Sequence, residues 1–190
     1  MKDFRIFSAA LLVLVAAFGF TACEDDDFED EQPRVAILNL DGPNVTGPIV
    51  AAGTHRFGVQ FYEEDLEGLD GRELTAIRVF VGLSPVSMRL SVHAGGDVVP
   101  GQELSALNIL GDITERSFVD YELVTPVTIS DDDVLWLVAE VELDREQQVI
   151  GCDAGPAVEG GDWLWSGDRW LTYRERTSES INWNIRGVVE

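Results

Sequence analysis

A short segment near the C-terminus, GDWLWSGDRW (residues 161–170), holds three of the chain's five tryptophans. Indole rings offer broad apolar faces with a polar edge, so an exposed cluster can stack on a sugar ring or anchor a protein partner. Gly167-Asp168 is a favoured dipeptide for a two-residue hairpin turn, and a turn there pairs Trp165 with Trp170 across two short strands. Because side chains alternate along a strand, Trp163 then shares a face with both of them.

The opposite face of this predicted hairpin carries Leu164 and Leu171, so both faces are largely apolar. One of the two faces must meet the core, and the alternation alone does not decide which. The segment is therefore either a wall of the core or a platform for a ligand. The candidate ligand-binding residues are Trp165, Trp163, Trp170 and Arg169.

Residues suited to nucleophilic catalysis are few. His55 and His93 are the only histidines, both fall in predicted strands, and no nucleophile elbow, zinc-protease helix or phosphate loop accompanies them. Cys152 precedes Asp153, whose charge raises a thiol pKa, so we expect a small buried residue there. With 35 acidic residues, carboxylate pairs suited to glycoside cleavage arise by chance. We expect no catalytic residues, and a small glycan-acting enzyme is the least favoured alternative.

Acidic residues also offer the oxygen ligands that calcium prefers. Asp131, Asp132 and Asp133 stand together at a predicted turn, and Asp153 lies in the loop-rich C-terminal third. None of them follows the pattern of a helix-loop-helix calcium site. A solvated acidic turn is the favoured account of the triplet, so these four residues are weak metal candidates and a structural calcium ion stays open.

The elements that must position these residues are strands. From residue 34 onward apolar and polar residues alternate, and Gly, Pro or Asp interrupt the pattern at short intervals, which predicts an all-β, single-domain antiparallel β-sandwich of the jelly-roll type. Residues 134–143 are apolar on both faces in their first half, which indicates a central strand. Only residues 62–69 could form a helix. The predicted strands are 34–40, 55–61, 74–81, 86–93, 104–110, 118–123 and 134–143, beside the hairpin.

The N-terminus has the pattern of a targeting segment. Lys2 and Arg5 precede an apolar run over residues 6–20, which is shorter than the ~20 residues that span a bilayer. The run ends in Phe20-Thr21-Ala22-Cys23, which resembles the lipobox of bacterial lipoproteins, so we expect Cys23 to carry the lipid. Two or more acyl chains give stable anchoring, which makes the membrane a partner through this anchor.

An acidic segment follows the cysteine directly. Its like charges repel one another, which predicts a solvated linker. It also resembles the surface-export signal of some Gram-negative lipoproteins, and a plain spacer is the alternative. The expected organisation is a signal peptide at 1–22, an acidic linker at 23–33 and a β-sandwich domain at 34–190, in an outer-membrane lipoprotein that faces the cell exterior.

Composition excludes two further classes. A hydrophobic content of 45% rules out a disordered chain. A formal net charge of −22 repels phosphate backbones, so nucleic acid is excluded as a partner.

Several motif pieces together resemble the cleaved-adhesin type of jelly-roll domain, known from gingipain haemagglutinin regions and from secreted or lipid-anchored bacterial proteins. The resemblance covers about residues 55–190. The pieces are Gly151–Ala157, Gly161-Asp162-Trp163, Gly167–Trp170 and Asn182–Gly187, preceded in matching order by Asp65-Leu66, Gly71, Leu74–Ile77 and Leu135-Trp136-Leu137.

This resemblance implies an adhesive or accessory binding role, with calcium bound in some members. Positions like Trp163 and Trp170 recur in the family motif, whereas Trp165 is an addition to it. We therefore expect the tryptophan face to meet the core, with Trp163 and Trp170 mainly structural and Trp165 at the border of a recognition surface. The expected function is a non-catalytic, adhesin-like binding module for a glycan or protein ligand, and the alternative is an assembly subunit of an outer-membrane secretion or uptake system.

Overall fold

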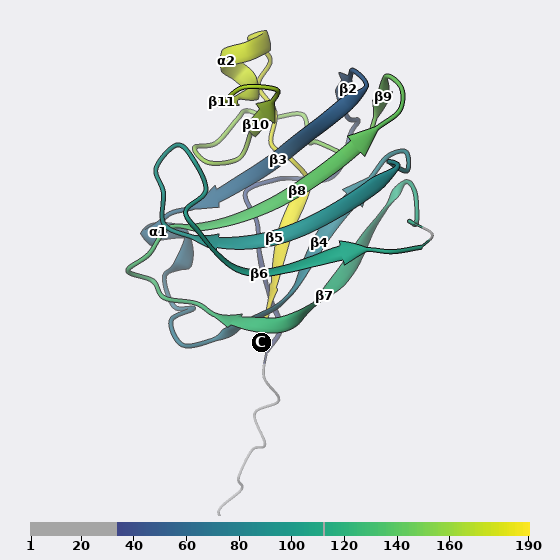
Figure 1. The fold of residues 1–190 in the computed structure, drawn as a ribbon. Coiled ribbons are helices and arrows are strands. Elements are labelled where there is room, and N and C mark those ends of the chain that lie inside the picture. The colour runs from purple at the N-terminus through teal and green to yellow at the C-terminus, as the bar shows by residue number, and fades with distance from the viewer. Residues whose placement is uncertain (1–33, 112) are drawn as a thin grey trace, which may run out of the picture. The chain divides into compact units, whose positions relative to one another are not determined.

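The computed structural model describes residues 34–111 and 113–190, which form two facing antiparallel sheets (Figure 1). The all-β sandwich predicted from the alternation is confirmed. One sheet has the order β1 (Ala36–Leu38), β12 (Ile185–Val189), β4 (Glu73–Val81), β7 (Ser117–Thr128). The other has the order β11 (Trp170–Thr172), β10 (Trp163–Ser166), β3 (Gly53–Phe61), β8 (Leu135–Leu143), β5 (Ser87–Ala94), β6 (Gln102–Ile109). The short strands β2 (Ile49–Val50) and β9 (Gln147–Gln148) pair with each other.

The signal peptide, Cys23 and the acidic linker lie outside the described residues. In the part of the chain that is described, the helices are too short and too polar to cross a membrane.

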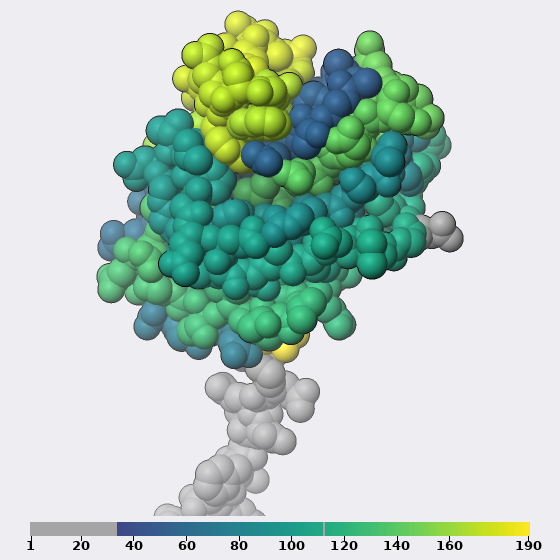
Figure 2. Space-filling view, viewed as in Figure 1, coloured from purple at the N-terminus to yellow at the C-terminus, as the bar shows by residue number. Residues whose placement is uncertain are grey.

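The main core lies between the two sheets and is built by alternate residues of each strand. In β4 these are Ile77, Val79 and Val81, and in β5 they are Met88, Leu90 and Val92, all buried as the period-two pattern predicts. Each strand thereby sends its remaining side chains to the outer face of its own sheet. The face that concerns function is the outer face of the six-stranded sheet, which Figure 2 shows hollowed beneath the hairpin that rises at its upper edge.

Strand β8 explains why its sequence is apolar on both sides. It runs between β3 and β5, so it is a central strand as predicted. Leu137 and Ala139 point into the main core, whereas Trp136 and Val138 lie on the outer face in a second, smaller apolar cluster. The outer face of this sheet is therefore partly apolar at its centre.

The two helices are short. Helix α1 (Glu63–Leu66) begins where the Asp65 carboxylate accepts from the Tyr62 N–H, and it ends earlier than the predicted 62–69 because Glu67 leaves the helical conformation. Helix α2 (Tyr173–Thr177) follows β11 directly. Its N-cap Thr172 bonds reciprocally with Glu175, an arrangement that the strand-based prediction missed, as it missed β12.

Candidate functional site

The tryptophan hairpin has the register that its turn dipeptide predicts, with Trp165 opposite Trp170 and Leu164 opposite Leu171. Strand β10 also pairs with β3, so the hairpin extends the edge of the six-stranded sheet. Leu164 consequently continues the inner face and joins the main core. We expected the tryptophan face to meet the core. This face continues the outer face of the sheet, away from the main core, and its rings pack into a second, smaller hydrophobic cluster.

On the outer face the tryptophans gather around Trp136. The Trp170 ring is buried and lies 5.7 Å from the Trp136 ring, and the Trp163 ring lies 5.4 Å from it. Gly58 makes this possible, since a Cβ there would stand 3.0 Å from a ring carbon of Trp170. The indole of Trp170 thus lies against bare backbone and forms one wall of a cavity.

A row of charged side chains continues from the hairpin across the sheet. Strand pairing places Trp165 beside Arg56, Arg56 beside Glu140, and Glu140 beside Arg89. The Arg56 guanidinium stacks 4.5 Å over the Trp165 ring, and its Nε donates to Glu140 Oε2 at 2.5 Å. Trp165 therefore supports a charged group instead of presenting a free apolar face.

Arg89, on the next strand, pairs with the edge strand β6. Its Nη2 donates to Glu103 Oε1 at 2.7 Å and to Oε2 at 2.8 Å. Both ion pairs are about one-third exposed, so solvent screens them and neither contributes much to stability. Their position suits them to ligand contact.

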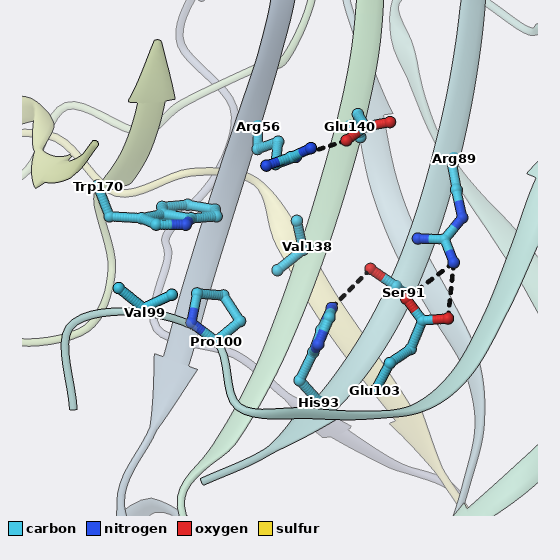
Figure 3. A pocket seen from close by; sticks show the side chains of 10 residues that line it. All are labelled: Arg56, Arg89, Ser91, His93, Val99, Pro100, Glu103, Val138, Glu140 and Trp170. Carbon is cyan, nitrogen blue, oxygen red and sulfur yellow. Dashed lines mark hydrogen bonds and ion pairs between the residues drawn. The ribbon is translucent and has the colours of Figure 1, made fainter. Parts of the chain in front are cut away.

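His93 and Ser91 complete the polar lining (Figure 3). His93 Nδ1 lies 3.3 Å from the Gly101 carbonyl oxygen, which can only accept, so Nδ1 carries the proton. His93 Nε2 then accepts from Ser91 Oγ at 2.9 Å. Burial is the largest cause that lowers the pKa of His93, which favours the neutral ring.

These residues enclose a cavity of about 250 Å³ on the outer face. Figure 3 shows Trp170 on one side with the loop residues Val99 and Pro100 below it, the Arg56–Glu140 pair above, the Arg89–Glu103 pair on the opposite side, and Val138 between them. The arrangement combines one aromatic wall with several hydrogen-bonding groups. Such a mixture is typical of small-ligand sites.

Gln60, which the sequence analysis missed, links the tryptophan hairpin to the loop that leads to Val99 and Pro100. Its Oε1 accepts from Trp163 Nε1 at 2.9 Å, and its Nε2 donates to the carbonyl oxygens of Gly96 and Asp97. Trp136 Nε1 bonds the same Gly96 oxygen at 2.9 Å. Gln60 is fully buried on a face where polar side chains are normally solvated, and the sequence offers no signal for that.

Of the four predicted ligand residues only Trp170 lines the cavity. Trp163 and Trp165 lie behind it in the same cluster, and Arg169 lies exposed at the hairpin tip. Cys152 is buried with a free thiol, and burial together with the charge of Asp153 raises its pKa to about 11, as expected for an inert cysteine. His55 also lies apart from the cavity, with Nε2 2.9 Å from the Ala51 carbonyl oxygen and Nδ1 3.2 Å from Ser166 Oγ.

The acidic candidates separate into two kinds. Asp153 is buried and accepts four hydrogen bonds, from the N–H groups of Gly42, Gly155 and Asn182 and from Asn182 Nδ2. Burial raises the pKa of Asp153, but these four bonds together outweigh it and the net shift is downward. The carboxylate therefore has a structural role.

The triplet Asp131, Asp132 and Asp133 forms the turn that leads into β8, with the last two exposed. Within residues 34–111 and 113–190, no group of three or more His, Cys, Asp or Glu residues could hold a metal ion. Calcium binding stays a prediction from the sequence.

The motif pieces behind the family resemblance meet at the base of the hairpin. Trp183 is fully buried, its N–H donates to the Gly161 carbonyl and its Nε1 donates to the Trp163 carbonyl. Asn182 and Asp153 bond each other beside it. These residues hold the hairpin against the sandwich, whereas Trp170, in another of the motif pieces, lines the cavity.

Comparison with known proteins yields no matching family model and no matching curated protein. Two solved structures have a similar fold. One is a clostridial cysteine protease, Cwp84, after propeptide cleavage, with a TM-score of 0.63 and 9% identity over 82% of this chain and 40% of that chain. The other contains the cysteine protease and lectin-like domains of Cwp84, a surface layer associated protein of Clostridium difficile, with a TM-score of 0.60 and 8% identity over 82% of this chain and 36% of that chain. At these identities the likeness shows the fold alone.

Proposed function

We propose that this protein is a non-catalytic carbohydrate-binding module of the bacterial cell envelope, anchored through a lipid on Cys23 and exposed at the cell surface. The observation that carries the proposal is the cavity on the outer face of the six-stranded sheet. There the Trp170 ring stands opposite the Arg56–Glu140 and Arg89–Glu103 pairs. The lectin-like domain of one structural neighbour is compatible with it.

The chemistry of the cavity suits a sugar. A pyranose ring has apolar C–H faces that can contact an indole, and hydroxyl groups that both donate and accept hydrogen bonds. Trp170 supplies the apolar wall, arginine N–H groups donate, and the carboxylates accept. A protein partner would need a larger complementary surface, with about 800 Å² buried on each side.

The absence of catalysis is proposed on geometric grounds. Ser91 and His93 form a hydrogen-bonded pair, but Ser91 lies in the middle of β5, which pairs with β6 on one side and β8 on the other. The ladders use the backbone N–H groups around Ser91, so they are not free to stabilise an oxyanion. The site around Ser91 therefore lacks the free N–H donors that would stabilise the oxyanion of an acyl-transfer reaction.

The experiment is a glycan array followed by calorimetry on the sugars that bind, with Arg56→Ala as the test variant. Losing hydrogen bonds from a charged donor should weaken binding about tenfold or more. Arg78→Ala is the matched control. Arg78 pairs with Asp120 across β4 and β7 on the outer face of the other sheet, with similar exposure.

Equal binding by the Arg56 and Arg78 variants would contradict the proposed site. A wild-type protein that binds no carbohydrate on the array would contradict the function itself and favour the assembly-subunit alternative.

A further inference from the structure

A second cavity of about 270 Å³ lies next to the first on the same outer face. The two cavities share Arg89 and Glu140 in their linings. The first continues toward Ser91 and His93 on β5, and the second toward Ser87 on the same strand. The two cavities therefore lie end to end along the strand direction with these two side chains between them, and we call the pair the groove.

The length of the groove follows from strand geometry. From Ser87 to His93 the strand advances six residues at ~3.3 Å each, which gives a distance of roughly 20 Å. A single sugar unit would occupy only one of the two cavities. The shared Arg89 and Glu140 lie between them, where a ligand that spans both would have its middle.

The hydrogen-bonding groups along the groove favour a ligand without charge. Within the described residues, Arg56 bonds a carboxylate only through Nε and Arg89 only through Nη2, so each guanidinium keeps N–H groups for a ligand. The negative charges of Glu140 and Glu103 offset the positive charges of the two arginines. The lining of the second cavity adds the carboxylate of Glu142 but no further positively charged side chain. Together with the net charge of −22, this disfavours an anionic ligand.

We infer that the ligand of this groove is a neutral, linear oligosaccharide that lies along β5 and β8 and occupies both cavities. This inference rests on the proposed function and adds the length and the charge of the ligand. The arginine donors and glutamate acceptors at the middle bond the hydroxyl groups of the central units. Trp170 contacts a unit at one end, and Asn108 lies beside the units at the other.

The experiment measures calorimetric affinity for monomer-to-hexamer series of gluco-, xylo- and manno-oligosaccharides, with oligogalacturonides as the anionic series. Affinity for a neutral series should rise at least about tenfold between the dimer and the longest members, and change little with added salt because no ion pair forms with the ligand.

Two variants locate the ligand. Asn108→Ala should abolish the additional affinity of the long oligosaccharides and leave the affinity for the short ones unchanged, because Asn108 lines only the second cavity. Arg56→Ala should weaken every member. Glu122→Ala, an exposed change on β7 of the other sheet, should alter none of these affinities.

Affinity independent of length, an Asn108 variant equal to wild type on the hexamer, or stronger binding of oligogalacturonides would each overturn the inference. The proposed function would still stand if Arg56→Ala weakened binding of a glycan found on the array. If none of the series binds, the inference falls, and the array decides separately whether carbohydrate binding falls with it.

Discussion

His93 links strand β5 to the loop that contains Gly101, and both border the cavity. Its ring is half-buried between the Ser91 hydroxyl and the Gly101 carbonyl. Burial lowers the pKa of His93 most, the charges of Arg89 and Arg56 lower it further, and the Gly101 hydrogen bond and Glu103 oppose them. On protonation the Ser91 hydroxyl would accept from Nε2 instead of donating to it, so the pKa shift comes mainly from burial of the ring and not from this hydrogen bond.

This gives a prediction for pH. The unfolded chain takes up the His93 proton near its ordinary pKa of 6.5, whereas the folded protein takes it up at lower pH. The unfolded state binds more protons between these two values, so stability falls as pH decreases from 6.5 through that window. Denaturant titrations over pH should show this loss in wild type and a smaller one in His93→Gln, whose amide does not titrate. Parallel curves for the two proteins would contradict the shifted pKa.

The β10–β11 hairpin owes its position to the strand beside it. Register places Trp163 opposite Gly58 of β3, and the absence of a side chain at Gly58 lets the Trp170 ring settle against the sheet. A Cβ at Gly58 would also stand 3.4 Å from Trp136. A side chain at position 58 would therefore fit only if the Trp170 ring moved by a few tenths of an ångström.

Gly58→Ala should displace the Trp170 ring and cost about 1–3 kcal/mol of stability through overpacking. Near-ultraviolet circular dichroism and tryptophan fluorescence should change with it, and carbohydrate affinity should fall. Gly42→Ala is the control, because a Cβ there meets nothing closer than 3.7 Å and should leave all four measurements unchanged. A Gly58 variant with wild-type spectra and stability would show that the ring has room to move.

The two sheets of the sandwich turn different faces to solvent. The described chain enters through β1, which pairs with β12 in the four-stranded sheet (Figure 1). The groove proposed above lies on the outer face of the six-stranded sheet. The first described strand and the proposed groove thus belong to different sheets. This arrangement is compatible with a module that is held at a membrane and binds outward.

The proposed lipid anchor predicts that Cys23→Ala moves the protein from the membrane fraction to a soluble or unprocessed form, because two or more acyl chains are what make such an anchor stable. Detergent partition of cell fractions measures this, and the carbohydrate affinity of the purified variant should equal that of wild type. Unchanged membrane partition would contradict the lipid anchor and would leave the proposed binding site unaffected.

Local patterns determined much of this protein. Alternation predicted the buried faces of β4 and β5 and the central place of β8, and the Gly167-Asp168 dipeptide predicted the hairpin register, because strand periodicity and turn conformation depend on neighbouring residues. The targeting pattern before residue 34 likewise belongs to the sequence alone.

Only the tertiary structure decided the rest. Which hairpin face meets the core depends on the strand that β10 pairs with, and β3 lies over one hundred positions earlier in the chain. The row of Arg56, Glu140 and Arg89 likewise requires three distant strands to become neighbours, while the consecutive strands β4 and β5 separate into different sheets. Pairing between distant strands leaves no periodic trace in either strand, so the groove became visible only once the sheets were assembled.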